Sequence, residues 1–402
     1  MTQRQIIVYC GLLLSVGAFS IDITLPFFGP MAASLGAPPA SLHATVTLYI
    51  FFLGIGQLVM GSLADRFGRR PVIAAGLALY ALGALVALAS SGLAGVLVGR
   101  ALQGLGGAVG PVLGRAMVRD VSGSVELPRN MALASGIFAV GPIFAPLIGV
   151  GLAGAGGSWR AVFVAMCLFA LGLVLALTRL PETLRARQAS ALAPATLLAN
   201  ARAVLRDRQS RFFMLLAALA MVGMITIIAG LPRIYEFNFG IGGALFAVLF
   251  GLHGVGIIIG QILNHRLIGQ VGPVTSAIVA SVIMSAACLA VVLLSIAGLI
   301  GPYSLSAAMF TFAIGYLIVF SNATAMTLEP HGMIAGFASS FFGFFAQVIS
   351  SVIGTIAVAL VGGNVTAWSL LLLAVSLGCL LALIGWRRRD GIVASPLPQG
   401  KT

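Results

Sequence analysis

The chain has 402 residues, of which 60% are hydrophobic and only 8% are charged, and its mean hydropathy is +1.12. A soluble globular domain carries roughly 25% charged residues, so this chain has too few polar groups to cover a surface in water. The composition therefore excludes an ordinary soluble protein and indicates an integral membrane protein. All four cysteines lie inside apolar runs, which predicts small hydrophobic side chains rather than disulfides or metal ligands.

Long apolar runs recur along the whole chain. A membrane-spanning helix needs about 20 such residues to cross about 30 Å of hydrocarbon. The strict alternation of a lipid-facing barrel is absent. The first run continues past the length of a signal peptide and is not followed by a small-residue cleavage site, so we expect it to be retained. Twelve runs qualify as helices: 6–28, 42–63, 72–92, 94–117, 130–153, 161–180, 212–232, 242–263, 274–297, 300–327, 334–358 and 366–386.

The net charge of +13 is distributed unevenly over the connections between these runs. Eighteen of the 22 basic residues fall in connections on one side, the opposite side has only Arg160 and Arg233, and Arg100 and Arg115 fall inside a span. Basic loops stay in the cytoplasm. The pattern predicts a multi-pass protein of a bacterial inner membrane with both termini cytoplasmic, and it accounts for the basic charge without nucleic acid.

One long polar stretch divides the chain. We expect a first six-helix unit at 1–180, a cytoplasmic linker at 181–210 with a surface helix near 194–207, a second six-helix unit at 211–386 and a cytoplasmic tail at 387–402. The halves look related, because Gly56, Arg66 and Gly136 recur as Gly256, Arg266 and Gly336 at an offset of 200 residues. Two repeated bundles around a central site are the architecture of alternating-access carriers.

The connection after the second span reads GSLADRFGRRPV, residues 61–72. Gly68 permits a tight turn, and Pro71 suits the first turn of the next helix. The string resembles the signature loop of the major facilitator superfamily, in which the loop latches the two halves together and its aspartate lies against a helix end. The resemblance implies an all-α integral membrane fold with twelve transmembrane helices in two pseudo-symmetric six-helix bundles. Its latch positions are Gly61, Asp65, Arg66, Gly68, Arg69 and Arg70.

Two further strings resemble motifs of proton-coupled members of that family. GRALQGLGGAVG (99–110) resembles a helix 4 motif through Arg100, Gln103 and Gly104, and GIFAVGPIFAPLIGVGLAG (136–154) resembles the helix 5 motif of antiporters through Gly141, Pro142, Pro146 and Gly149. With IDITLP, GRRPV and MVRDV, they resemble the bicyclomycin/chloramphenicol-resistance branch of drug/proton antiporters. The resemblance implies export of small, lipophilic drug-like molecules in exchange for protons.

Asp22 is the first acid of the chain and lies inside an apolar run. At 1.5 Å per residue, Asp22 and Arg100 both fall in the outer half of the membrane. An ionisable residue at that depth usually faces a cavity or a partner. We therefore expect Asp22 and Arg100 to couple protons to transport. Two alternatives stay open: a wetted Asp22 that caps a turn before Pro26, and an Arg100 that serves as a structural donor to the backbone of the first or fifth span.

The other acids are expected near the ends of the spans, with Glu236 in an outer loop and Glu329 at the end of the tenth span. His253 lies within the eighth span and is either a titrating group or a polar residue that lines the cavity. Aromatic and methionine side chains suit varied lipophilic ligands, because they pack without strict geometry. Candidates for substrate contact are Tyr49, Gln57, Gln103, Met221, Met224, Tyr316, Asn322, Phe341, Phe345 and Gln347.

The residues favour a transporter over other classes of membrane protein. The only lysine is Lys401, and no paired histidines or paired acids lie at membrane depth, so an enzyme, a cofactor site and a metal site are not expected. No phosphate-binding loop for nucleotide-driven pumping is present. We expect a monomer that contacts lipids, protons and a small-molecule substrate. An exporter of an endogenous siderophore, amino acid or sugar would carry the same motifs.

Overall fold

A computed structural model describes residues 2–123, 126–154, 158–184, 187 and 193–389, and their regular structure is helical. Eleven helical segments of this described part are long and apolar enough to cross a membrane. The first half contains α1 (Gln3–Asp22), α2 (Phe28–Leu35), α3 (His43–Phe67), α4 (Arg69–Ala89), α5 (Leu93–Gly107), α6 (Val109–Val121), α7 (Leu127–Gly154) and α8 (Ala161–Thr178). The second half contains α9 (Pro194–Arg206), α10 (Arg208–Phe239), α11 (Gly243–Ile296), α12 (Pro302–Leu328), α13 (Ala335–Val361) and α14 (Val365–Arg389).

The eleventh helix accounts for two of the twelve predicted spans. It has 54 residues, about 80 Å of helix, which is more than twice the hydrocarbon thickness. Gly272 breaks it with a φ of 78° and a ψ of 168°, a conformation that other residues rarely adopt, and Pro273 follows. The break lies between the predicted runs 242–263 and 274–297, so the twelve-span fold is confirmed.

Several predicted boundaries are wrong by up to a few turns. The first span continues past the end of α1 through a short 3-10 turn, η1 (Leu25–Phe27), into α2, and it ends at Leu35. The seventh extends from Arg208 to Phe239, so Glu236 lies inside α10 rather than in a loop. The last extends to Arg389, and the rest of the expected tail (390–402) lies outside the described residues. A helix, α9, is present where the linker was expected to carry one.

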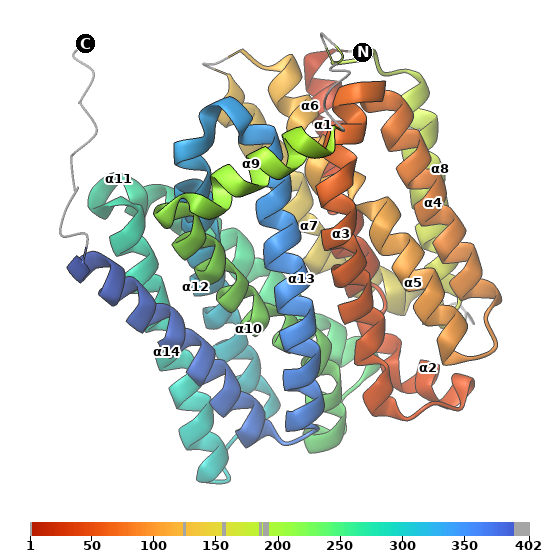
Figure 1. Ribbon diagram of the computed structural model, residues 1–402. Coiled ribbons are helices and arrows are strands. Elements are labelled where there is room, and N and C mark those ends of the chain that lie inside the picture. The colour runs from red at the N-terminus through yellow and green to blue at the C-terminus, as the bar shows by residue number, and fades with distance from the viewer. Residues whose placement is uncertain (1, 124–125, 155–157, 185–186, 188–192, 390–402) are drawn as a thin grey trace.

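The two halves lie side by side in Figure 1 and meet along a seam. In this seam α3 packs on α13, and α7 packs on the first limb of α11. Of the two pairs of glycines that repeat at an offset of 200 residues, Gly56 and Gly256 make the same kind of contact, whereas an added Cβ at Gly136 or Gly336 would meet nothing within 4 Å. A Cβ added at Gly56 would lie 2.8 Å from the carbonyl oxygen of Leu105, and one added at Gly256 would lie 2.5 Å from that of Phe310. Gly56 and Gly256 thus each bring a helix against the helix two spans later, as a duplicated bundle requires.

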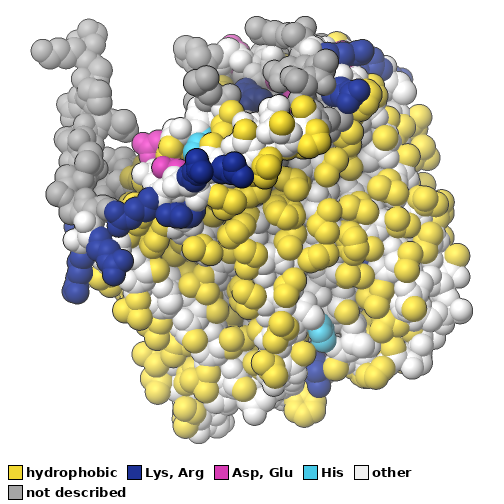
Figure 2. All heavy atoms as spheres, viewed as in Figure 1, with side chains coloured by type: hydrophobic (Ala, Val, Ile, Leu, Met, Phe, Trp, Pro, Cys, Tyr) yellow, Lys and Arg dark blue, Asp and Glu magenta, His cyan; other side chains and the backbone are white. Residues whose placement is uncertain are grey.

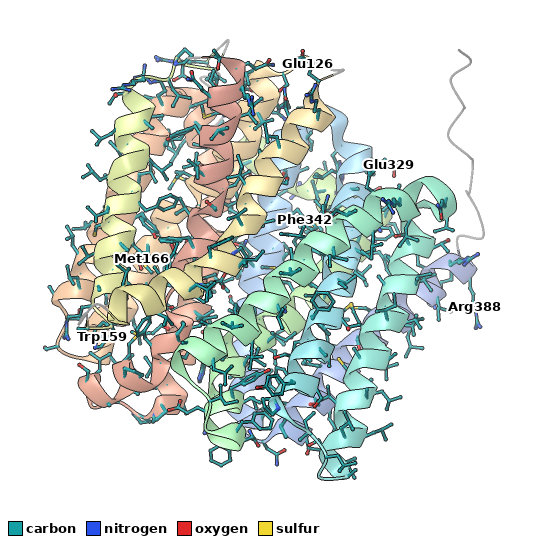
Figure 3. The ribbon with its side chains drawn as sticks, turned by 180° about the vertical axis from the view of Figure 1, so that it is seen from behind. Glu126, Trp159, Met166, Glu329, Phe342 and Arg388 are labelled. Atoms are coloured by element: carbon teal, nitrogen blue, oxygen red, sulfur yellow. The ribbon has the colours of Figure 1, made fainter. Side chains whose placement is uncertain are left out.

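Charged groups gather at one end of the molecule, which we call the basic end. Figure 2 shows basic side chains there, above a broad apolar belt. Arg66 lies on the last turn of α3, and Arg69 and Arg70 lie on the first turn of α4, where the two helices meet at this end. Glu126 and Glu329 also lie at this end in Figure 3, Trp159 lies at the opposite end, and Met166 and Phe342 lie between.

Close helix contact in the first half depends on glycine. A Cβ at Gly106 of α5 would lie 2.4 Å from the carbonyl oxygen of Gly76 on α4, whereas a Cβ at Gly172 of α8 would meet no atom within 4 Å. We expect Gly106→Ala to lower the melting temperature in detergent by a few degrees, because overpacking costs about 1–3 kcal/mol. Gly172→Ala, the control, keeps or raises it, since alanine favours a helix by about 1 kcal/mol. Equal melting temperatures for the two variants would contradict this packing.

Candidate functional site

Asp22 is the last residue of α1 and precedes a break in the helix within the first span. Pro26 lies in the 3-10 turn that follows, where its missing N–H cannot continue an α-helix. The side chain of Asp22 is only 4% exposed, so it is not the wetted cap that stood as one alternative. Among the residues that the structure describes, none donates a hydrogen bond to its carboxyl group or forms an ion pair with it. Asp22 is thus a buried acid without a fixed partner.

Arg100 is completely buried and is surrounded by neutral groups. Its Nε donates to the carbonyl oxygen of Thr45 on α3 at 3.0 Å, and its Nη1 donates to Oε1 of Gln103, one turn further along α5, also at 3.0 Å. The guanidinium carbon lies 4.3 Å from the centre of the Tyr49 ring, which suits a cation–π contact. Arg100 therefore acts as a donor to the backbone of the second span, not of the first or fifth, and its Nη2 has no partner in the described structure.

Further polar side chains extend this cluster across the first bundle. Gln103 Nε2 lies 3.1 Å from Sδ of Met166 on α8, and the hydroxyl groups of Ser20 on α1 and Tyr80 on α4 are hydrogen-bonded to each other. The hydroxyl group of Tyr49 is buried and unpaired within the described part of the chain. Tyr80, Ser20 and Met166 were not predicted as site residues. A tyrosine in the middle of an apolar run was the one signal for Tyr80, since its hydroxyl group needs a partner when buried.

Two of the predicted substrate residues meet across the seam. Gln57 on α3 donates from Nε2 to Oε1 of Gln347 on α13 at 2.7 Å. A Cβ added at Gly343 would lie 2.0 Å from Oε1 of Gln57, so a small residue is required opposite this amide. Phe341 and Phe345 lie on the same helix as Gln347. This amide pair is a direct polar contact between the halves.

Asn322 makes a structural contact in the second bundle. Its Nδ2 donates to Oδ1 of Asn264 at 3.0 Å, and the hydroxyl group of Ser276 donates to the same oxygen at 3.2 Å. These bonds tie α12 to both limbs of α11, and the Oδ1 of Asn322 stays unpaired in the described residues. Tyr316, on the same helix as Asn322, stacks on Phe320 with ring centres 5.6 Å apart.

The remaining candidates are buried or half-buried on the same two bundles. Met221 and Met224 lie on α10, and neither is exposed. His253 is 2% exposed, stacks on Phe250 at 5.6 Å, and has two ring nitrogens without a partner in the described chain. His253 is therefore a buried histidine in an aromatic environment.

The antiporter-like motif lies where α7 meets its neighbours. A Cβ at Gly149 would lie 2.7 Å from the carbonyl oxygen of Ile23, directly after Asp22, and Gly141 faces Ala18 of α1. Pro142, which removes a backbone donor inside α7, lies against Gly254 of α11. Pro146 is buried one turn later. The motif thus packs both on the helix that carries Asp22 and across the seam.

Comparison with known proteins places the fold. A family model described as the Major Facilitator Superfamily matches residues 10–355. The chain belongs to the Major Facilitator Superfamily. The D-xylose–proton symporter has the same fold, with a TM-score of 0.74 at 12% identity over 93% of this chain and 96% of that one. The human organic anion transporter MFSD10 has a TM-score of 0.68 at 20% identity over 95% of this chain and 100% of that one.

Relatives in sequence include bacterial transporters of the same superfamily. The chain is 29% identical over 89% of its length to the uncharacterized MFS-type transporter YdgK of Bacillus subtilis, 88% of which is covered. It is 26% identical over 86% of its length to the bicyclomycin resistance protein homolog of Haemophilus influenzae, 87% of which is covered. It is 34% identical over 43% of its length to the multidrug resistance protein D of Escherichia coli, with 44% covered.

The superfamily's signature loop forms a charge network at the basic end. Arg69 donates from Nη1 to Oδ1 of Asp65 at 2.8 Å and from Nε to Oδ2 of Asp120 at 3.1 Å. Gly68, with a φ of 105°, makes the turn between α3 and α4. Gly61 brings α3 close to Ser340 of α13, across the seam. Arg66 lies over the ring of Phe67. The loop therefore joins α3, α4 and α6, while its helix packs on the other half.

Glu182 completes this network, a contact that was not predicted from the sequence. Its Oε1 accepts from the backbone N–H of Arg69 at 2.9 Å, and its Oε2 accepts from that of Arg70 at 3.2 Å. A carboxylate at a helix N-terminus is favoured by the unpaired N–H groups and the helix dipole. Burial raises the pKa of this carboxyl group, but the backbone donors outweigh burial and hold the pKa of Glu182 below its ordinary value.

We expect Glu182→Gln to lower the melting temperature at pH 7, because an amide offers the first turn of α4 one acceptor oxygen instead of two. Loss of a helix cap costs about 0.5–2 kcal/mol. Since the folded-state pKa is lowered, the stabilisation is present above the unfolded pKa of about 4.3 and is lost as the pH falls through the folded pKa.

Melting curves in detergent between pH 3 and pH 8 measure this effect. The difference in melting temperature between Glu182→Gln and the wild type should disappear at the lowest pH. Glu126→Gln, at the same end of the molecule, is the control, because Glu126 accepts from the side chain of Gln3. A difference that stays constant with pH would rule out the capping role.

Proposed function

We propose that the chain is a proton-coupled efflux transporter that exports small, lipophilic, drug-like molecules by alternating access. The bicyclomycin resistance and multidrug resistance relatives support drug export over export of an endogenous metabolite. The observation that carries the proton coupling is the buried, unpaired carboxyl group of Asp22. The uneven basic residues support a bacterial inner membrane location with both termini cytoplasmic, and hence a cytoplasmic basic end.

The burial of Asp22 gives it two states of very different cost. An ionised side chain in the middle of a membrane costs at least about 2.5–3.5 kcal/mol, whereas a neutral acid costs much less. No fixed cation in the described chain offsets that cost. Asp22 therefore holds a proton when the bundle excludes water, and it releases the proton only when water or a substrate reaches it. Binding of substrate and binding of the proton become mutually exclusive, which an antiporter requires.

Arg100 has a different role in this scheme. Its guanidinium group is held by a backbone carbonyl, an amide and an aromatic ring rather than by Asp22, and its Nη2 has no partner in the described residues. A permanent positive charge in the same bundle raises the electrostatic cost of a second cation there. Arg100 and Gln103 thus form a fixed positive element, while Asp22 is the group that changes charge.

The seam supplies the moving contacts. The units at 1–180 and 211–386 rock against each other, with the linker 181–210 as their cytoplasmic connection, and the latch residues of the signature loop hold one end closed. The pair Gln57–Gln347 breaks and re-forms in each cycle. In this scheme the substrate contacts that pair and the other predicted residues, which are Tyr49 and Gln103 from the first half and Met221, Met224, Tyr316, Asn322, Phe341 and Phe345 from the second. The transporter works as a monomer in the lipid bilayer.

Replacement of the acid tests the coupling. In inverted vesicles with an acidic lumen, we expect the wild type to accumulate both a lipophilic cation and a neutral antibiotic. Asp22→Asn should reduce this accumulation at least tenfold, because the amide cannot release a proton. Its melting temperature in detergent should stay close to that of the wild type, which shows that it folds.

Glu329→Gln is the control, since Glu329 lies at the basic end and accepts from Gln209. It should accumulate substrate like the wild type. Normal uphill accumulation of the neutral antibiotic by Asp22→Asn would refute the assignment of the proton site. The absence of accumulation of any drug by the wild type would refute drug export itself.

A further inference from the structure

A cavity lies at the seam, at the end opposite the basic end. It has a volume of about 370 Å³ and takes its walls from η1 and α2 in the first half and from α10, α11 and the segment between them in the second. Val150 of α7 closes another side. Since both halves contribute walls, the shape of the cavity depends on how they are oriented.

The lining of this cavity combines one acid with apolar groups. Glu236 is its only charged residue, and the rest are proline, glycine and hydrophobic residues that include Phe27, Phe28 and Phe246. Aromatic rings present a negative face to a cation, and a carboxylate supplies a full negative charge. Neutral lipophilic molecules gain from such walls as well, but they gain nothing from the acid.

The residues around Glu236 hold its carboxyl group at the wall of the cavity. The left-handed Gly240 ends α10 one turn later, so Glu236 lies on the last turns of a long helix rather than on a loop. A Cβ added at Gly29 would lie 2.8 Å from Oε1 of Glu236, so the carboxyl group lies directly against the first turn of α2, in the other half. Its side chain remains exposed to solvent.

No basic side chain neutralises this acid. Glu236 forms no ion pair within 4.0 Å in the described residues. Arg233 lies one turn earlier on α10 but is not part of the cavity wall, and it interacts electrostatically with His43. The carboxylate is therefore free to bind an external cation.

We propose that this cavity, with Glu236 as its anion and Phe27, Phe28 and Phe246 as its aromatic walls, is a binding site for lipophilic organic cations at the outer mouth of the transporter. This proposal rests on the proposed function and adds a substrate class to it. A cation that leaves the centre of the protein passes this acid before it reaches water. Neutral substrates pass the same walls without this interaction.

Charge variants at position 236 test the site. The probes are tetraphenylphosphonium as a lipophilic cation and chloramphenicol as a neutral compound, measured by transport into inverted vesicles and by binding to the purified protein. We expect Glu236→Gln to weaken the binding of tetraphenylphosphonium about tenfold, in the range of a contact ion pair near a protein surface. The binding and transport of chloramphenicol should change less than twofold.

Two further variants separate charge from folding. Glu236→Asp keeps the anion and should retain most of the cation affinity, whereas Glu236→Lys should reduce it further than Gln does. High salt should reduce the difference in tetraphenylphosphonium affinity between the wild type and Glu236→Gln, because salt screens exposed charges. If all three variants bind tetraphenylphosphonium like the wild type while the wild type exports both probes, the outer cation site is refuted and the proposed function stands. If the wild type exports neither probe, the proposed function itself has failed.

Discussion

The structure depends on the low polarity of the membrane, in which a buried polar group is costly unless it has a partner inside the protein. Arg100 shows how the chain meets this constraint for a full charge. Its donors are directed at Thr45 and Gln103, and its plane lies over Tyr49. Asp22, in the same bundle, has no such set of partners among the described residues. Arg100 is held by three neutral groups, whereas Asp22 has no partner in the part of the chain that the structure describes, and this difference is the basis of our proposal that Asp22 is the group that changes its charge.

Glycine makes this arrangement possible. Gly104 allows α5 to approach the backbone of Tyr49 on α3, with an added Cβ only 2.4 Å from that carbonyl oxygen. This approach brings Arg100, one turn earlier, to the carbonyl oxygen of Thr45. In lipid there is no hydrophobic gain from pressing helices together, so such close contacts and hydrogen bonds supply the specificity of packing. The small residues of the signature motifs therefore have a direct role in placing the charged ones.

The sequence predicted the fold well because its signal is large and local. Twenty apolar residues in a row define a span without any tertiary information, and the pair of spans inside α11 was separated by Gly272 and Pro273 in the sequence as in the structure. The ends of the spans were less predictable, because helices such as α10 extend beyond the apolar run. Glu236 was predicted to lie in a loop for that reason, because a charged residue that follows an apolar run indicates the end of a span.

The partners of the buried polar groups could not be predicted from the sequence. An amide in an apolar run needs a hydrogen-bond partner, but nothing near Asn322 in the sequence identifies Asn264, 58 residues earlier, as that partner. Arg100 was expected near Asp22 from depth alone. Depth gives the position of a residue along the membrane normal but not within the membrane plane. The acceptor that Arg100 uses is a backbone carbonyl group, and because every residue has one, the sequence does not single it out. The contact of Glu182 with the start of α4 likewise depends on how the polar connection after α8 folds back.

The three acids that matter most differ in how much water they meet, and this difference divides the work between them. Glu182 is tied to two backbone donors and stays charged, so it stabilises the basic end without taking part in exchange. Asp22 is enclosed and unpaired, and we propose that its charge follows the access of water and substrate. Glu236 is exposed and unpaired in the described residues, and we propose that it favours cationic substrates. In the mechanism that we propose, the carrier couples transport at one acid and favours cationic substrates at another. Selectivity can then change through the outer cavity while the proton step stays intact.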